Sequence, residues 1–212
     1  NIGTTGFKGS RVVFKEMLAE ADGIVNQSHR QVRLDDIKTD FAAGGIKVTN
    51  RALDVAISGD GFFEVETEQG LRYTRAGSFK VDQEGNLAMH EGHLLMGDGG
   101  PIATPPDKAL LIMENGQVMA EDLELGKLKI VEFADRSQLE QVGHSLWKAP
   151  EGIESEIIEN ARVIPGAIER SNVNAVKAMT EMVRISRSYE ALLKAVETFR
   201  TADKRTVSDL GK

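Results

Sequence analysis

The sequence predicts a mainly β middle domain, built as a short-strand sandwich or a partly closed barrel, with a long C-terminal α-helix and a partly missing N-terminal helical region. Two observations predict this fold class. Most of the chain's 21 glycines lie between Gly44 and Gly126, where they separate short runs of alternating apolar and polar residues. The segment from Val173 to Leu210 contains no glycine and no proline, which favours one uninterrupted helix. The chain therefore divides into residues 1–39, 40–165 and 166–212.

The first region, residues 1–39, begins with a turn from Gly3 to Gly9. The residues from Gly23 to Lys38 are polar and only weakly periodic, which indicates an extended connector. Between the turn and the connector we expect a short amphipathic helix. Its apolar side would consist of Val12, Val13, Phe14, Met17 and Leu18.

The middle region, residues 40–165, shows the period of two that is typical of strands, with Phe63 and Val65 on one side of a run. The turns at Gly59, Gly61 and Gly77 are expected to need positive φ angles. The expected strands are Leu53–Ser58, Phe62–Thr67, Leu71–Arg75, Ser78–Asp82, Leu87–Met89, Leu94–Met96, Leu110–Met113, Gln117–Ala120, Lys127–Ala134 and Leu146–Ala149.

The third region, residues 166–212, carries the predicted helix. Ser171, Asn172 and Asn174 are candidates for its N-cap. At 1.5 Å per residue, a helix from Val173 to Leu210 would be roughly 50 Å long. Apolar residues recur at alternating steps of three and four, the a/d spacing of a coiled-coil seam. These seam residues are Met182, Ile185, Tyr189, Leu192, Val196 and Phe199.

An apolar stripe on a helix must be covered, so the seam requires a partner. An ordinary helix that packs on its own domain is one interpretation, but the length of the segment favours another helix as the partner. The short helix expected in the first region is not long enough. Because the chain begins at Asn1 rather than Met, we expect that it is one half of a two-helix stalk whose other half is missing.

Composition excludes several classes of protein. The chain has 212 residues, a formal net charge of −7 and 41% hydrophobic residues, which are ordinary values for a globular protein. Lysine and arginine are spread evenly, so nucleic acid is not an expected partner. No apolar run is long enough to cross a bilayer, and no secretory signal peptide is visible. The absence of cysteine excludes disulfides, thiol catalysis and thiolate metal sites.

No cofactor and no metal site is expected. The segment His90-Glu91-Gly92-His93 offers two imidazoles and a carboxylate, but it lacks the spacing of a zinc-binding helix. His29 and His144 lie far from it in the sequence. The glycine-rich run from Gly97 to Pro101 lacks the Lys-Ser/Thr pair of a phosphate-binding loop. The run from Asp82 to Asn86 lacks the closing glutamate of a calcium loop.

We also predict that the protein is not an enzyme. Asp54, Asp60 and Glu64 are the candidates for the paired carboxylates of a glycosidase. However, Asp60 precedes Gly61 in a turn, and the other two are expected on solvated faces of strands. The alternative is a secreted β-rich carbohydrate-binding or hydrolytic module with a helical tail. Only 5% of the residues are aromatic and there is one tryptophan, which are few for a sugar-stacking surface.

Four motifs occur in order along the chain. Asn1 to Lys8 resembles the end of the N-terminal signature of flagellar rod and hook proteins, with its T-x-G-[FY] turn. Leu53 to Phe63 resembles their L-D-[VF]-A-I-x-G-x-G-[FW]-F motif, and Tyr73 to Phe79 their Y-T-R-x-G-x-F motif. Ser171 to Asn174, followed by Arg187 to Glu190, resembles their S-N-V-[ND] and R-x-[YF]-E pattern. The motif residues are Thr5, Gly6, Phe7, Leu53, Asp54, Gly59, Gly61, Phe63, Tyr73, Thr74, Arg75, Gly77, Ser171 and Asn172.

The chain is thus similar to the flagellar rod and hook family, and most like its proximal rod proteins, with the distal rod proteins second. The resemblance implies a structural subunit of the basal-body rod that serves motility. It implies type III export without a cleavable signal peptide, followed by self-assembly in the periplasm. The implied partners are other copies and neighbouring rod proteins, with the export apparatus and chaperones in addition. In this family an amphipathic helix precedes the T-T-G-F turn, and such a helix would be the partner that the seam requires.

Overall fold

The computed structural model describes the backbone of residues 1–19, 29–106, 108–143 and 145–210, and side chains outside 11–38 and 202–210. The chain divides into one compact unit, Asn1–Val173, and a second unit that starts at Asn174. The first unit is built of strands and the second of one long helix, which confirms the predicted fold class.

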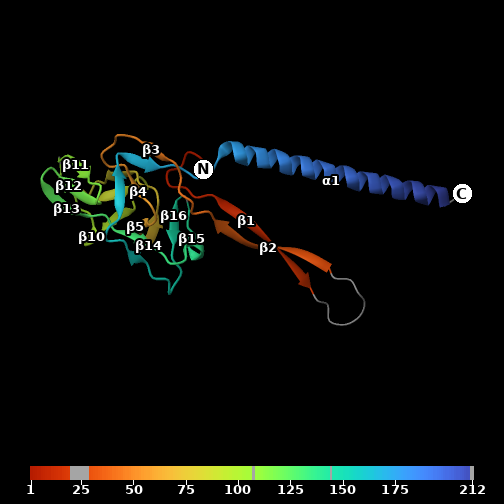
Figure 1. Cartoon of the computed structure of the whole chain (residues 1–212), viewed down its shortest axis with the longest axis horizontal. Helices are drawn as coiled ribbons and strands as arrows, with labels where there is room; N and C mark the ends of the chain where they lie inside the picture. Colours follow the sequence, from red (N-terminus) through yellow and green to blue (C-terminus); the bar gives the residue numbers. More distant parts are fainter. Residues whose placement is uncertain (20–28, 107, 144, 211–212) are drawn as a thin grey trace. The chain divides into compact units, whose positions relative to one another are not determined.

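The largest sheet of the first unit has the strand order β15-β16-β6-β5-β9-β8-β7. Its strands β5, β15 and β16 are labelled in Figure 1. These strands are β5 (Phe62–Thr67), β6 (Gly70–Thr74), β7 (Phe79–Val81), β8 (Leu87–Met89), β9 (Leu94–Gly97), β15 (Glu140–Gln141) and β16 (Leu146–Lys148). Strand β10 (Gly100–Pro101) pairs with β9, and β14 (Ile130–Glu132) pairs with both β5 and β17 (Glu156–Ile157). A 3-10 turn, η1 (Arg136–Gln138), precedes β15. The pairings are antiparallel, as short hairpin connections require.

Within residues 46–169, three smaller sheets accompany the large one. Strands β11 (Leu110–Ile112), β12 (Gln117–Ala120) and β13 (Leu123–Lys127) form the first of them. Strand β4 (Val55–Ser58) pairs with β18 (Arg162–Pro165), and β3 (Ile46–Val48) pairs with β19 (Ala167–Glu169). Among the described residues, no sheet closes into a barrel. Because β19 reaches Glu169, the β-rich unit continues beyond the boundary at 165 that the sequence predicts.

The prediction of a short helix in the first region is wrong. The chain forms strand β1 (Ser10–Ala19), which pairs antiparallel with β2 (His29–Thr39), with a register shift between Val13 and Phe14. Val12, Val13 and Phe14 belong to residue types that favour strands, and the pairing with β2 provides the hydrogen bonds that a helix would otherwise make within itself. The extended connector agrees with β2 over residues 29–38; its residues 23–28 lie outside the described part of the chain.

The predicted strand Lys127–Ala134 is divided between two sheets. Strand β13 ends at Lys127, and β14 begins at Ile130. Between them the Leu128 amide donates to the Gly116 carbonyl, and the Lys129 amide donates to the Met96 carbonyl. The chain therefore crosses from the small sheet to the large one, a change of partner that a run of apolar residues does not reveal.

Alternation along β5 creates a core on each face of the large sheet. Phe63 and Val65 belong to the larger apolar cluster. Phe62 belongs to a second cluster, in which Trp147 and Tyr73 are packed with it. The rings in the second cluster are close; the Phe62 and Trp147 centroids are 5.7 Å apart. The period of two along this strand is thus confirmed.

The second unit is helix α1 (Ala175–Leu210). Asn174 is its N-cap, since its side-chain Oδ1 accepts a hydrogen bond from the Lys177 amide at 3.1 Å. The helix therefore starts later than the boundary at 166, and the other two N-cap candidates, Ser171 and Asn172, lie before it in the first unit. No helix in the described part of the chain has both the length and the apolarity needed to cross a membrane.

Candidate functional site

The first and last motifs of the sequence meet in the first unit. The N-terminal turn lies against the residues that precede α1: the Gly6 amide donates to the Glu169 carbonyl at 2.8 Å. The Gly9 amide donates to Oδ1 of Asn172 at 2.8 Å, and the Asn172 amide donates to the Phe7 carbonyl at 3.3 Å. Residues 5–9 and 169–172, with the side chains that bridge them, are called the junction below.

A buried ionic cluster lies inside the junction. Lys8 Nζ donates to Oε1 of Glu169 at 2.5 Å and to the Ala42 carbonyl at 2.8 Å. The same Oε1 accepts from the Gly44 amide at 2.8 Å, and the other oxygen, Oε2, accepts from Nη1 of Arg75 at 3.3 Å. The Lys8 and Glu169 side chains are each 1% exposed and that of Arg75 is 5% exposed. One carboxylate therefore joins four segments of the chain.

Each charge in this cluster depends on the others. Burial lowers the pKa of Lys8, and the hydrogen bond and negative charge of Glu169 oppose that shift. Burial likewise lowers the pKa of Arg75, opposed first by the charge of Glu169. Nη2 of Arg75 donates to the Gly59 carbonyl at 2.8 Å, and its guanidinium carbon lies 5.5 Å from the centroid of the Phe62 ring. The Nε atom of Arg75 has no hydrogen-bond partner among the described residues.

Arg75 is a predicted motif residue, but Lys8 and Glu169 are not among the residues that the sequence singles out. The only signal is that they adjoin motifs: Lys8 follows Phe7, and Glu169 lies two residues before Ser171. Most lysine and glutamate side chains in proteins are exposed to solvent. The sequence therefore does not distinguish this buried pair from surface charges.

Two hydrogen bonds that meet at Ser145 attach the Y-T-R motif to the N-terminal turn. Thr74 Oγ1 donates to the Ser145 carbonyl at 2.7 Å and accepts from the Ala76 amide at 3.0 Å. Ser145 Oγ in turn donates to the Thr5 carbonyl at 3.1 Å. The Ser171 hydroxyl remains local, since it accepts from the Val173 amide. Thr5, Thr74 and Arg75 thus all hold the junction, and Ser145 is a member that the sequence did not indicate.

The predicted glycine roles hold at two of three positions. Gly59 and Gly61 have φ angles of 102° and 113°, as expected for turns. Gly77 is different: its φ is not in the left-handed region, but a Cβ atom there would lie 1.6 Å from the Val55 carbonyl oxygen. The prediction of a positive φ at Gly77 is therefore wrong. The position requires glycine because two backbones approach each other, with the Val55 amide donating to the Gly77 carbonyl.

Asp54 is buried, not on a solvated face as predicted. Its Oδ2 accepts from the Thr49 hydroxyl at 2.7 Å and from Nε of Arg51 at 2.8 Å, and its Oδ1 accepts from the Ser78 hydroxyl at 2.9 Å. Burial alone would raise the pKa of Asp54, but these three hydrogen bonds outweigh it and hold the pKa below its usual value. The preceding Leu53 packs against the larger apolar cluster.

The other two candidate carboxylates are held separately. Glu64 is 2% exposed, again in contrast to the solvated face that the sequence predicts, and it accepts from Lys129 at 2.8 Å. Asp60 is exposed and accepts from Arg136 at 2.7 Å, which is the first cause of its lowered pKa. The three carboxylates are therefore each joined to a different cation.

The aromatic motif residues belong to the interior. Phe63 is fully buried in the larger cluster, and Tyr73 stacks edge-on with Phe133 at 4.7 Å between centroids. Trp147, the single tryptophan, is also fully buried. Neither Tyr73 nor Trp147 is therefore available as a surface on which a sugar could stack.

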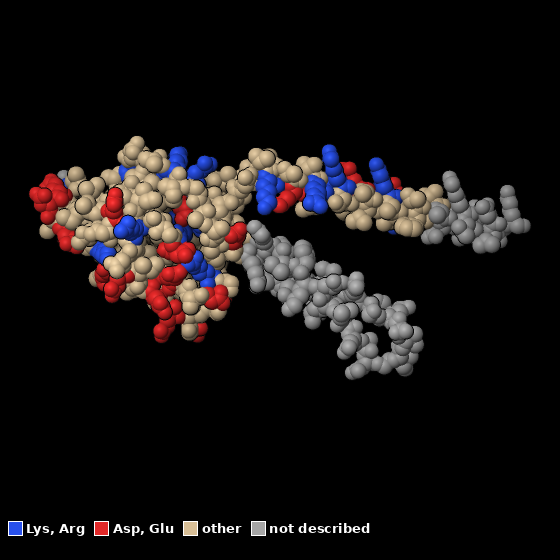
Figure 2. All heavy atoms as spheres, viewed as in Figure 1, with Lys and Arg blue, Asp and Glu red and all other residues tan. Residues whose placement is uncertain are grey.

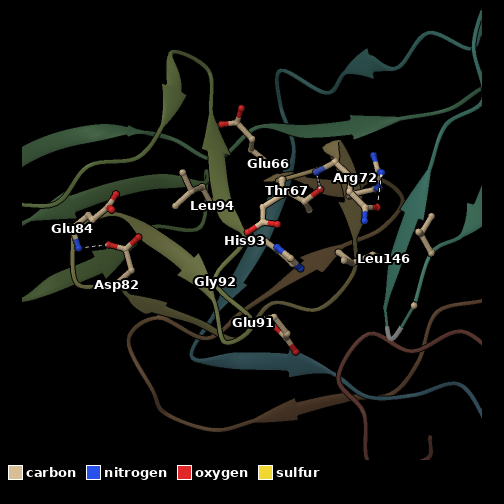
Figure 3. A pocket seen from close by; sticks show the side chains of 14 residues that line it. Glu66, Thr67, Arg72, Asp82, Glu84, Glu91, Gly92, His93, Leu94 and Leu146 are labelled. Atoms are coloured by element: carbon tan, nitrogen blue, oxygen red, sulfur yellow. Dashed lines mark hydrogen bonds between the residues drawn. The ribbon is translucent and has the colours of Figure 1, made fainter.

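A cleft of about 760 Å³ is lined by none of residues 5–9 and 169–172 (Figure 3). Its lining is mostly acidic and polar, with Arg72 and His93 as basic members. Thr67 and Arg72 project from β5 and β6, and His93 and Glu91 come from the turn before β9 (Figure 3). Among the described residues, no group of three His, Asp or Glu side chains is arranged to hold a metal ion. His29 and His144 lie outside the residues whose side chains are described.

The predicted seam residues are all on α1 and are all exposed in the single chain. Their exposed fractions run from 48% at Val196 to 71% at Phe199. Other large apolar residues of α1, including Val176, Met179 and Leu193, are also exposed. On the face shown in Figure 2, basic and acidic side chains are interspersed along the described part of the helix. The helix thus presents apolar surface that no other residue of α1 covers.

Comparison with known proteins gives the family. Residues 56–120 match the model described as flagellar hook protein FlgE/F/G D1 domain, and residues 164–209 match the flagellar basal body rod FlgEFG protein C-terminal model. The chain is 33% identical to the flagellar basal-body rod protein FlgG of Bacillus subtilis over 93% of this chain and 85% of that protein. The chain belongs to the flagellar basal-body rod protein family.

Relatives in this rod protein family carry two names. The FlgF protein of Escherichia coli is 30% identical over 93% of this chain and 83% of its own length. That of Caulobacter vibrioides is 29% identical over 100% of this chain and 88% of its own length. FlgF and FlgG relatives match at similar identity, so the comparisons support the rod family as a whole.

Proposed function

We propose that this chain is a structural subunit of the bacterial flagellar rod, which assembles with other copies of itself and with neighbouring rod proteins. The observation that carries the proposal is the exposed seam of α1 in a chain of this family. An apolar stripe on a helix must be covered, and heptad spacing is typical of a stripe that another helix covers. The subunit acts through its interfaces and catalyses no reaction.

The seam supports helix-to-helix assembly by its arrangement. Leu192 and Val196 lie one turn apart in the middle of it, and both side chains are exposed in the single chain. The small residues Ala191 and Ala195 lie beside them and allow a partner helix to approach closely. The partner that we propose is a terminal helix of the same family, contributed by another subunit.

The family also suggests where this assembly takes place. We propose that the chain is exported unfolded by the type III apparatus of the flagellum, with chaperones as transient partners, and joins the rod in the periplasmic space. The curated names of the relatives support the basal body as the location. The alternative of a secreted carbohydrate-binding or hydrolytic module has no support from these relatives or from the buried Trp147.

A complementation experiment tests the proposal. In a bacterium that lacks its own copy of this protein, the unaltered gene should restore motility, and a Leu192→Glu/Val196→Glu variant should not. The two carboxylates would have to be buried in the seam, at a cost of several kcal/mol each. A matched control, Ser188→Glu/Thr198→Glu, adds the same charge at exposed polar positions of α1 and should restore motility.

The purified seam variant must keep its β-rich unit folded, which the fluorescence of the buried Trp147 reports. Rods isolated from the complemented cells would be searched for the chain by immunoblot. If the seam variant folds normally and still enters rods and supports motility, the proposed role of the seam is wrong.

A further inference from the structure

The junction differs from the rest of the first unit in what holds it together. Its members are joined by hydrogen bonds and charges: the Lys8 and Glu169 side chains meet, and Asn172 bonds to Gly9 through Oδ1. Nδ2 of Asn172 also donates to the carbonyls of Asp40 and Ala42, at 2.7 and 3.1 Å. The sheets, by contrast, enclose apolar clusters around residues such as Phe63 and Leu95.

This difference affects the cost of opening each part. When an apolar core opens, its side chains enter water with no compensation. When a buried ion pair opens, the charges regain hydration that offsets much of the attraction they lose. Separating Lys8 from Glu169 is therefore less costly than separating the strands of the core. Local opening of such regions, apart from global unfolding, is a general property of proteins.

The contacts of the junction also close the longest loops in the unit. Lys8 and Glu169 are separated by 161 positions, and Gly9 and Asn172 by 163. Contacts between the ends of a chain carry a large closure entropy unless the intervening residues are already ordered. Closing the junction is therefore favoured once the β-core between its two ends is ordered.

Opening would free both segments together. The amides of Gly6 and Gly9 donate to residues 169 and 172, and the amide of Asn172 donates back to Phe7. Each segment thus supplies acceptors to the other, and residues 40–45 supply the rest: the Arg170 amide donates to the Gly45 carbonyl at 2.9 Å. Loss of the ionic cluster removes the anchor that keeps Glu169 in place, and the reciprocal backbone bonds lose their register with it.

We propose that the junction is a clasp: the N-terminal turn, residues 5–9, and the segment that precedes α1, residues 169–172, open and close as one unit, separately from the β-core. The residues that lead into the assembly helix are bonded to the docked N-terminal turn and also to residues 40–46, so opening of the junction releases the contacts to the turn. The clasp is a property of the single subunit, so it extends the proposed function without depending on it, and its test requires no assembly.

The test is amide hydrogen exchange on the whole chain, which measures the opening of each region. In the variant Lys8→Met, the amides of Gly6, Gly9 and Asn172 should exchange at least tenfold faster. The amides of Leu87 and Leu128, which are bonded within the β-core, should keep their rates. The matched control Lys80→Met removes an exposed lysine on β7 and should change neither set.

The variant Asn172→Ala provides an independent arm in case Lys8→Met does not fold, since it removes amide contacts and leaves the charges intact. It should release the same three amides. In the double variant, exchange should be no faster than about twice that of the faster single variant. Each single substitution already opens the junction, so the second one has few remaining junction contacts to remove. Unchanged junction amides, equal acceleration across the whole unit, or fully multiplicative effects would each overturn the proposal.

Discussion

Lys8 and Glu169 are 161 positions apart in the sequence, yet their charged groups meet at 2.5 Å in the interior of the β-rich unit. Around this pair the structure gathers Arg75, which directly follows β6, and the Gly44 amide from the loop before β3. The motifs typical of the family are thus connected through two residues that lie beside them. This relationship predicts where substitutions will be most damaging.

The first prediction concerns the charge of Glu169. The variant Glu169→Gln keeps the size of the side chain but leaves Lys8 and Arg75 buried without a carboxylate. Breaking a buried ion pair from one side costs about 3–5 kcal/mol, so we expect the free energy of unfolding to fall by about that amount. Urea denaturation followed by Trp147 fluorescence measures it. The control Glu156→Gln, at an exposed position of β17, should change stability by about 0.5 kcal/mol at most. A loss of under about 1 kcal/mol at Glu169 would contradict the prediction.

The second prediction concerns Gly77. In Gly77→Ala the new methyl group would lie 1.6 Å from the Val55 carbonyl oxygen, so the backbone itself would have to move. We expect a loss of about 3 kcal/mol or more in thermal or urea unfolding, at the upper end of overpacking effects. Gly99→Ala is the control, because no atom lies within 4 Å of a Cβ at that position. Similar stability of the two variants would show that the close approach is not limiting.

The third prediction is a dependence of stability on pH through Asp54. The pKa of this carboxyl is lower in the folded state than its ordinary value of 3.8. The folded state therefore binds fewer protons than the unfolded state between the two pKa values, so the contribution of Asp54 is fully present above about pH 5 and declines as the pH falls below about 4.

A comparison with Asp54→Asn isolates this contribution. At pH 7 the wild-type chain should be more stable than the variant by about 2 kcal/mol, since hydrogen bonds to a charged group are lost. The difference should shrink as the pH is lowered from 5 to 3, measured by urea denaturation at each pH. A difference that stays constant over that range would show that Asp54 does not titrate with a lowered pKa.

The fourth prediction concerns the start of α1. Asn174→Ala removes the side-chain oxygen that accepts from the Lys177 amide, which should destabilise the first turn of the helix by about 1 kcal/mol. Far-ultraviolet circular dichroism should show a reduced helical signal at elevated temperature. Asn174→Ser retains a capping oxygen and should keep the signal. If the alanine and serine variants behave alike, Asn174 is not the effective cap.

Residue types and spacing were sufficient for the parts of this protein that are built from local periodicity. Strands β5, β8 and β12 have the bounds that alternation predicts, because the side-chain period of two is a property of the extended backbone. The long helix α1 follows from the absence of glycine and proline and from its heptad spacing. Four ordered motifs were also sufficient to indicate the family.

Tertiary structure decided the features that depend on distant partners. Residues Val12 to Phe14 fit either a helix face or a strand, and pairing of β1 with β2 selects the strand. Asp54 and Glu64 alternate like surface residues, and their burial is explained only by the hydrogen-bond and ionic partners that the fold brings to them. Gly77 needs no unusual φ. It must be glycine because the Val55 carbonyl lies too close to leave room for a side chain. Lys8 and Glu169 show the same limit most clearly: burial of a charge becomes favourable only when its partner is in place, and that partner lies at the other end of the domain.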